Sequence, residues 1–389
     1  MDDQQGRHAL ILGASGITGW AIVNSILEGY SSKDAFAKVT AVTNRPLSRD
    51  DSGWPSDSRL DLVSGIDLLQ GGQASLNELI KEKIPSINTV THLYFYAYQQ
   101  NDDNRIECDV NRKMLERAVT AVENLSPKLA YTVLPSGTKI YGVHMLDQFP
   151  FADILPIKED APPLPEPWVS DLFYYDQIDC LKTLSRGKQW TWCEIRPDNI
   201  IGFVPNNNAY CLAQTLALYL SLFHYVEGGG ASCPFPGTEK SWKALYNESP
   251  QDMVARFSIH ASLHPEKTGT KSFNCAGEET SWKEKWPIIC QYFDLRGTPP
   301  VEGSMAPSAY MEDHRQDWDR LAKQSSLKGG FLDNNISHPH FQYFIMALLD
   351  FDRHMDMGAM RATGYTEIIN TNECWTIAFD RMRKARIIP

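Results

Sequence analysis

Residues 9–19 read ALILGASGITG, an apolar run that ends in a glycine-rich turn. An amphipathic stretch begins at Ile17, so the order predicts a strand, a tight turn and a helix. In such a unit Gly13 lets the chain turn sharply, Gly16 lets the backbone approach a pyrophosphate, and Gly19 lets the helix pack on the strand. The amino end of a helix attracts phosphate, so the turn predicts a dinucleotide site. The residues of that site are Gly13, Ser15, Gly16, Ile17, Thr18 and Gly19. The alternative is a turn that serves packing alone.

Composition and charge narrow the class of protein. The chain has 389 residues, of which 42% are hydrophobic and 22% charged, which is typical of a globular protein with two packed regions. The formal net charge of -11 argues against a nucleic-acid partner, because phosphate backbones require a basic surface. A small-molecule partner fits better.

Targeting signals and metal motifs are not apparent in the sequence. Residues 1–7 are polar, and the most apolar run, 209–226, is interrupted by polar side chains, so it predicts a buried helix and not a membrane span. The eight cysteines form no C-x-x-C pair, which predicts reduced, mostly buried thiols and no metal. We expect a cytoplasmic protein. A homodimer is one assembly that the sequence leaves open.

Hydrophobic patterns predict six strands separated by helices over the first two hundred residues. The strands are expected at 9–12, 38–43, 60–64, 89–96, 129–134 and 190–196, with helices that include 106–125 and 173–185. Strands that alternate with helices form a parallel sheet. The sequence therefore predicts an α/β fold in which a Rossmann-type, doubly wound parallel sheet occupies residues 1–204.

Beyond Pro205 the pattern changes, and predicted helices outnumber strands. This region, 205–389, is expected to form a smaller, mainly helical substrate domain. The expected helices lie at 209–226, 251–264, 281–293, 307–323, 340–355 and 370–384. A short strand at 272–275 predicts that a segment near 265–280 returns to the first domain.

The end of the second strand indicates which dinucleotide is bound. Where a carboxylate would accept the ribose 2′-hydroxyl of NAD, this chain has Asn44 and Arg45, and an arginine accommodates a 2′-phosphate. NADP(H) is therefore favoured, with Arg49 as a reserve cation; the alternative is a solvated Arg45 that Asp50 or Asp51 partly neutralises. After the third strand, Asp67 and Leu68 are expected at the adenine, unless Asp67 only caps its own loop.

The usual catalytic pair of short-chain dehydrogenases, a tyrosine four residues before a lysine, is absent. The residues four positions after Tyr174 and Tyr175 are Ile178 and Asp179. Instead, PSGTKIYG at 135–142 follows the fifth strand directly, at the sheet edge where ligands bind.

The motifs, taken in order, resemble those of the progesterone 5β-reductase and iridoid synthase family of atypical extended short-chain dehydrogenases, and the resemblance covers most of the chain. The motifs are the glycine turn 13–19, Asn44-Arg45-Pro46, residues 91–96, Asn111 with Met114, residues 137–141, Phe173-Tyr174-Tyr175, residues 196–205 and the terminus 384–389.

The resemblance implies a reaction and its residues. It assigns Lys139 and Tyr174 as the catalytic pair of an enzyme that uses NADPH to reduce the carbon–carbon double bond of an enone or enal. A phenol and an ammonium aimed at the carbonyl oxygen would stabilise the enolate as it forms. Positive charge on Lys139 is also expected to lower the pKa of Tyr174. The resemblance further places Tyr96, Lys139, Pro197, Asn199 and Ile200 at the cofactor.

Several departures from the family pattern leave the substrate open. This chain has Tyr96-Ala97-Tyr98 where the family often has tryptophan, a proline-rich segment at 162–169, and Asp198 where glycine is common. The candidate walls for a bulky apolar substrate, unless they are plain core, are Tyr94, Tyr98, Trp168, Tyr210, Phe341 and Tyr343. Three further functions stay open: ketone reduction by the same pair, a redox-neutral isomerase or cyclase that uses Tyr174 and Lys139, and a non-catalytic NADP-sensing protein.

Overall fold

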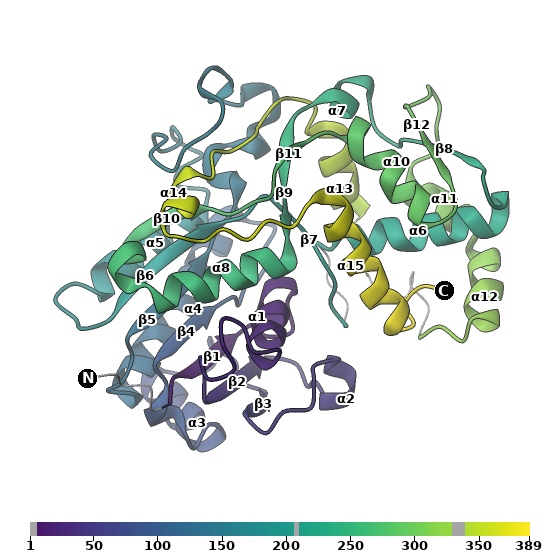
Figure 1. The fold of residues 1–389 in the computed structure, drawn as a ribbon. Helices are drawn as coiled ribbons and strands as arrows, with labels where there is room; N and C mark the ends of the chain where they lie inside the picture. The colour runs from purple at the N-terminus through teal and green to yellow at the C-terminus, as the bar shows by residue number, and fades with distance from the viewer. Residues whose placement is uncertain (1–5, 206–209, 329–338) are drawn as a thin grey trace.

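A seven-stranded, fully parallel sheet organises the chain (Figure 1). The computed structural model describes residues 6–205, 210–328 and 339–389. The strand order is β10-β6-β5-β4-β1-β2-β3. The strands are β1 (His8–Leu12), β2 (Lys38–Thr43), β3 (Leu60–Ser64), β4 (His92–Phe95), β5 (Tyr131–Pro135), β6 (Thr191–Arg196) and β10 (Lys271–Asn274). The order reverses between β1 and β4, and ligands bind at the carboxyl ends of the strands beside such a reversal.

Both faces of the sheet are covered by helices. Alternate residues of β1 enter separate cores: Ala9 and Ile11 pack on one face, Leu10 and Leu12 on the other. The first face carries α1 (Ile17–Leu27) and α8 (Gln251–Leu263), which lie side by side. The second carries α3 (Gln73–Lys83), α4 (Asn104–Leu125) and α5 (Phe173–Leu184). The predicted doubly wound α/β fold is confirmed.

A long segment from beyond residue 205 returns to this sheet. Strand β10 pairs with β6. Helix α8, which precedes it, is hydrogen-bonded to residues at β4: the hydroxyls of Ser262 and Tyr94 lie 2.7 Å apart, and so do those of Ser258 and Tyr96. The returning segment therefore begins at Gln251, earlier than the sequence pattern suggested. The division of the chain at residue 204 stays a prediction.

The remaining elements are mainly helical, and most of them lie away from the seven-stranded sheet, although α9 lies beside the amino ends of β5 and β6 (Figure 1). The helices are α6 (Leu212–Glu227), α7 (Glu239–Lys243), α9 (Pro265–Thr268), α10 (Trp282–Tyr292), α11 (Pro307–Asp313), α12 (Arg315–Gln324), α13 (Pro339–Tyr343), α14 (Gly358–Ala362) and α15 (Thr371–Lys384). Two small sheets accompany them: β11 (Glu279–Thr280), β9 (Tyr246–Pro250) and β7 (Asn199–Ile201), and β12 (Arg296–Thr298) with β8 (Ser232–Pro234).

Two of the predicted helices are wrong in extent. The helix expected at 307–323 is divided at His314, whose ring contacts Asp317 at 3.0 Å and starts the second half. The helix expected at 340–355 ends with a π-turn at Leu348. The helix ends there because the following residues bond to another part of the chain: the amide of Arg353 donates to the carbonyl of Leu245 at 2.9 Å. Residue 209, expected to begin another helix, lies outside the described residues.

Three further findings concern expectations drawn from composition. Across residues 6–205, 210–328 and 339–389, we find no helix with the length and apolar character that a membrane crossing requires. In the same part of the chain, no group of three His, Cys, Asp or Glu side chains is arranged to hold a metal ion. All eight cysteines are free, and all except the half-buried Cys180 are buried.

Because two histidines are buried, we expect the free energy of unfolding to decrease at acidic pH. Burial lowers the pKa of His8 and of His92 to about 4, against about 6.5 in an unfolded chain. Between these values the unfolded state binds more protons than the native state, so stability is full above about pH 6.5 and falls as the pH drops towards 4. We expect the free energy of unfolding to fall on the order of 2 kcal/mol per histidine between about pH 7 and about pH 5.

Urea unfolding of the wild type and of His92→Gln at both pH values measures this effect. The variant should show a smaller loss on acidification, because it has one fewer group to protonate. Equal losses in the two proteins would contradict the assignment of His92.

Candidate functional site

The glycine turn between β1 and α1 has the geometry that a phosphate site requires. Gly13 has φ +80°, and a Cβ there would lie 2.4 Å from the carbonyl oxygen of Tyr96. A Cβ on Gly19 would lie 2.3 Å from the carbonyl oxygen of Gly13, so both positions exclude side chains. Helix α1 begins at Ile17 without a side-chain cap. Its first amides are therefore available to an anion.

An open cleft of about 1620 Å³ runs past this turn. It brings together most of the residues that the sequence assigned to the cofactor, and two of the proposed aromatic walls. These are Gly13, Ser15, Gly16, Ile17, Thr18, Gly19, Asn44, Arg45, Asp67, Leu68, Tyr96, Tyr98 and Tyr210. The other predicted site residues do not line the cleft; they are Lys139, Trp168, Tyr174, Pro197, Asn199, Ile200 and Tyr343.

The charged residues at the end of β2 differ in their availability. The Arg45 side chain is exposed and lines the cleft, and among the described residues it makes no hydrogen bond or ion pair. Arg49 instead donates to the carbonyl of Leu60 and does not line the cleft, so the expectation of a reserve cation is wrong. Asp67 lines the cleft, and its carboxylate also accepts from the amide of Leu69 at 2.9 Å. The contact with Leu69 matches the loop-capping interpretation, and the place of Asp67 at the adenine stays a prediction.

Cations from the C-terminal helix also reach the cleft, and sequence reasoning missed them. Arg381 and Lys384 of α15 line the cavity, together with Lys328. Arg381 lies over the ring of Trp20 at 5.1 Å and forms an ion pair with Asp252 at 2.9 Å. The signal was present as three basic residues in the last turn of α15, but nothing local indicated which site they face.

A row of aromatic rings leads away from the cleft. Tyr98, which is 44% exposed, stacks on Phe173 with 5.5 Å between ring centroids, and Tyr210 meets Tyr98 edge-on at 6.4 Å. Phe341 continues the row with 5.3 Å to Tyr210. The Tyr98 hydroxyl donates to Glu107 at 2.5 Å, a contact that the sequence gave no reason to expect. The row forms an apolar wall with one polar anchor.

Three proposed aromatic walls lie elsewhere. Tyr94 is fully buried and its hydroxyl contacts Ser262, so it belongs to the core, and its assignment as a wall is wrong. Tyr343 is 51% exposed and does not line the cleft. Trp168 is half-buried and packs edge-on against the ring of His144 at 5.4 Å.

Tyr174 lies at the carboxyl edge of the sheet, in the first turn of α5. Its hydroxyl is next to Gly137, where a Cβ would lie 3.3 Å from the oxygen, and that same Cβ position is 3.5 Å from the carbonyl oxygen of Pro197. Phe173 connects it to the aromatic row, with 4.6 Å between the two ring centroids. Among the described residues the Tyr174 hydroxyl has no hydrogen-bond partner, which leaves it available to a ligand.

The electrostatics of Tyr174 differ from expectation. Burial, followed by the negative charges of Glu107 and Glu194, raises the pKa of the phenol above its ordinary value. The predicted lowering of the pKa by Lys139 is therefore wrong. Lys139 is exposed, and its charge acts on His144, whose pKa is lowered to about 4 mainly by burial and further by this ammonium. Tyr174 is thus a neutral phenol, able to donate a proton.

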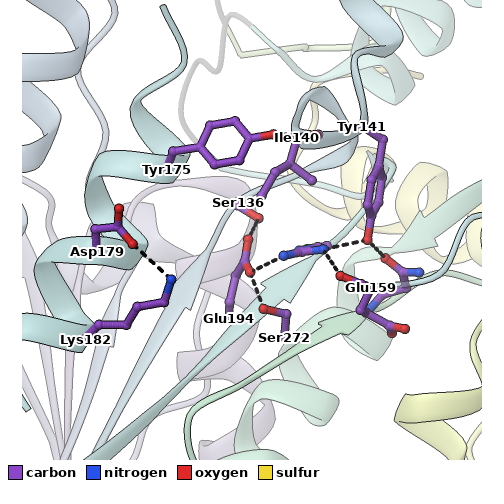
Figure 2. A network of polar contacts seen from close by, with 11 residues as sticks. Ser136, Ile140, Tyr141, Glu159, Tyr175, Asp179, Lys182, Glu194 and Ser272 are labelled. Carbon is purple, nitrogen blue, oxygen red and sulfur yellow. Dashed lines mark hydrogen bonds and ion pairs between the residues drawn. The ribbon is translucent and has the colours of Figure 1, made fainter. Parts of the chain in front are cut away.

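A buried polar network joins neighbouring strands of the sheet near Ser136 and Tyr141 (Figure 2). Glu194 of β6 accepts hydrogen bonds from Ser136 and Ser272 and forms an ion pair with Arg196 at 2.9 Å. Arg196 also donates to the hydroxyl of Tyr141 at 2.9 Å. The network joins the carboxyl ends of β5, β6 and β10, because its members come from all three. The sequence signal was a glutamate two residues before an arginine inside a predicted strand.

Comparison with known proteins identifies the family. The model of the PRISE-like Rossmann-fold domain family matches residues 9–389, so the chain belongs to this family. The short chain dehydrogenase sirQ of Leptosphaeria maculans is 35% identical over 397 residues, which cover 98% of this chain and 97% of that protein. The 3-oxo-Delta(4,5)-steroid 5-beta-reductase of Arabidopsis thaliana is 25% identical, covering 98% and 93% of the two chains. The predicted family resemblance is confirmed.

Solved structures support the fold. The Bordetella bronchiseptica enzyme WbmH, solved in complex with NAD⁺, matches with a TM-score of 0.58 at 15% identity, over 97% of this chain and 99% of that one. At this level of identity the likeness concerns the arrangement of the chain only.

Proposed function

We propose that this protein is an NADP(H)-dependent reductase that acts on the carbon–carbon double bond of an enone or enal carried by a bulky apolar molecule. The observation that carries the proposal is the unpartnered Tyr174 hydroxyl beside Gly137, at the edge of the sheet that also forms the cleft. The relative in Arabidopsis, whose name describes a ketone conjugated to a double bond, supports this substrate class.

The residues of the cleft fit NADP(H). The uncapped start of α1 would hold the pyrophosphate, and Asp67 and Leu68 would border the adenine. Arg45 is free to pair with a 2′-phosphate, while β2 ends without a carboxylate that would repel it. Main-chain groups near Pro197, Asn199 and Ile200 would border the nicotinamide. Bound NADPH would supply the hydride.

Tyr174 and Lys139 would handle the charge that develops on the substrate. When hydride adds to the β-carbon, electron density moves to the carbonyl oxygen, and a donor already aimed at that oxygen stabilises the enolate. Because its pKa is raised, the Tyr174 phenol keeps its proton and can donate a hydrogen bond to that oxygen. Lys139, two residues after Gly137 and exposed, can approach the same oxygen from the turn that follows β5.

A panel assay tests the proposal. The protein is incubated with NADPH and a series of aromatic and cyclic enones, NADPH consumption is followed, and the products are identified by mass spectrometry and NMR. We expect saturated ketones or aldehydes. Products with an intact double bond and a reduced carbonyl would instead indicate ketone reduction, and conversion without NADPH would indicate a redox-neutral enzyme.

Replacing Arg45 should change the preference between the two nicotinamide cofactors. Arg45→Gln removes a charge-assisted contact with the 2′-phosphate, so we expect the KM for NADPH to rise about tenfold or more while the KM for NADH stays nearly constant. Steady-state kinetics with both cofactors measures this. Arg105→Gln, an exposed arginine outside the cleft, is the matched control. An equal change for NADPH and NADH would contradict the assignment of Arg45.

A further inference from the structure

Asp198 is a buried carboxylate just after the end of β6. One carboxylate oxygen, Oδ1, accepts the hydroxyl of Thr138 at 3.2 Å and the amide of Asn199 at 2.8 Å. The amide of Asp198 donates to the hydroxyl of Ser249 at 2.8 Å. Asp198 is therefore bonded through its amide to β9 and through its carboxylate to the turn that follows β5.

Two buried basic side chains act electrostatically on this carboxylate. Arg353 and Lys285 are completely buried, and both attract Asp198. Lys285 also forms an ion pair with Glu248, and Glu248 accepts from the indole of Trp375 at 2.8 Å. Burial lowers the pKa of Lys285 well below its ordinary value, and it raises the pKa of Asp198 and that of Glu248, the latter to about 8. The two hydrogen bonds to Oδ1 favour one position of the buried carboxylate, because breaking them inside the protein is costly, while Oδ2 has no partner among the described residues.

Thr138 connects Asp198 to the turn that carries Lys139 and lies beside Tyr174. Its amide donates to the carbonyl of Pro197 at 3.2 Å, so both its main chain and its side chain are attached to residues 197–198. The residue before it is Gly137, where a Cβ would lie 3.3 Å from the Tyr174 hydroxyl oxygen, and the residue after it is Lys139. One anchored residue therefore lies between the two groups that must meet the substrate.

We propose that Asp198 and Thr138 are positioning residues, which fix the 136–139 turn so that Lys139 and the Tyr174 hydroxyl face the same substrate oxygen. The proposal rests on the reductase activity proposed above. A shift of about 1 Å in such a group lowers catalysis by about a hundredfold even when the group itself is intact.

The test compares two isosteric substitutions. Thr138→Val removes the hydroxyl that reaches Asp198. Thr132→Val makes the same change on β5, at a completely buried threonine whose hydroxyl has no partner among the described residues. We expect Thr138→Val to lower kcat about tenfold or more with little change in the KM for NADPH, and Thr132→Val to change neither. Thr138→Ser, which keeps the hydroxyl, should restore kcat.

A second readout does not depend on turnover. Binding of NADPH is titrated through its fluorescence, and the fluorescence lifetime of the bound nicotinamide is recorded for the wild type, Thr138→Val and Thr132→Val. We expect unchanged affinity in all three and a changed lifetime in Thr138→Val alone. Asp198→Asn, which keeps the acceptor oxygen and removes the charge, should also change the lifetime.

The outcomes separate the two proposals. A wild type that binds NADPH but reduces no enone overturns the reductase proposal, and the lifetimes then decide whether Thr138 positions the nicotinamide end of the site. A wild type that reduces enones, with kcat and lifetime unaffected by Thr138→Val, overturns the positioning role alone. Loss of kcat that Thr138→Ser does not restore also overturns it.

Discussion

Tyr174→Phe is expected to lower kcat by about a hundredfold to a thousandfold, equivalent to about 3 to 4 kcal/mol of transition-state stabilisation. The substitution removes only the hydroxyl, which lies beside Gly137 at the sheet edge and has no partner among the described residues. No internal hydrogen bond is lost, so the fold should keep its stability. The KM for NADPH should change little, because the glycine turn and Arg45 are untouched. Steady-state kinetics and thermal unfolding measure these effects.

The neighbouring tyrosine provides the control. The Tyr175 hydroxyl donates to the carbonyl of Ile140 at 3.0 Å and accepts from the amide of Leu164 at 3.1 Å. Tyr175→Phe therefore removes structural hydrogen bonds, and it should lower the unfolding temperature more than kcat. Equal loss of kcat in both variants, or none in Tyr174→Phe, would contradict the catalytic assignment of Tyr174.

Gly13→Ala is expected to abolish measurable NADPH binding. The added Cβ would lie 2.4 Å from the carbonyl oxygen of Tyr96, and the backbone has φ +80°, which L-residues rarely adopt. The backbone conformation alone costs about 1 to 2 kcal/mol, and relief of the overlap would displace either the turn or the end of β4. Both border the cleft, so the phosphate site would be lost with the turn. Fluorescence titration with NADPH and thermal unfolding measure the two effects.

A second glycine with a similar backbone separates strain from overlap. Gly187 has φ +73°, but a Cβ there would meet nothing within 4 Å, and it does not line the cleft. Gly187→Ala should therefore lower the unfolding temperature slightly and leave NADPH binding intact. Unchanged NADPH affinity in Gly13→Ala would show that the turn does not hold the cofactor.

The sequence predicted the sheet well because its strands carry local signals. The runs at 9–12, 38–43, 60–64, 129–134 and 190–196 all correspond to strands. Most of them are buried on both faces, whereas the edge strand at 60–64 is only partly buried. Helix ends were less predictable, because contacts distant in the chain decide them. The helix expected to reach 355 ends at Leu348, where Arg353 and its neighbours bond to the strand region near 245 instead.

The same distinction applies to the candidate site. The glycine turn, Arg45 and Asp67 each follow a strand directly, and the parallel sheet brings such positions to one edge. Hydrogen bonds between residues that are not adjacent in the chain leave no pattern in the sequence from which they could be predicted. Examples are the hydrogen bonds between Tyr98 and Glu107, between Tyr96 and Ser258, and between Thr138 and Asp198. Family resemblance indicated Tyr174 and Lys139. The direction of the Tyr174 pKa shift could not be predicted in this way, because it depends on burial and on charges that only the folded structure places.

The return of α8 and β10 to the sheet has a consequence for how this chain is made. Until about residue 274 has left the ribosome, β6 is an open sheet edge, and the face that α8 covers, with Tyr94 and Tyr131, is exposed to water. A fragment that stops near residue 204 would carry the whole glycine turn and still be prone to aggregation. Truncations and fusions of this protein should therefore preserve the chain through Asn274.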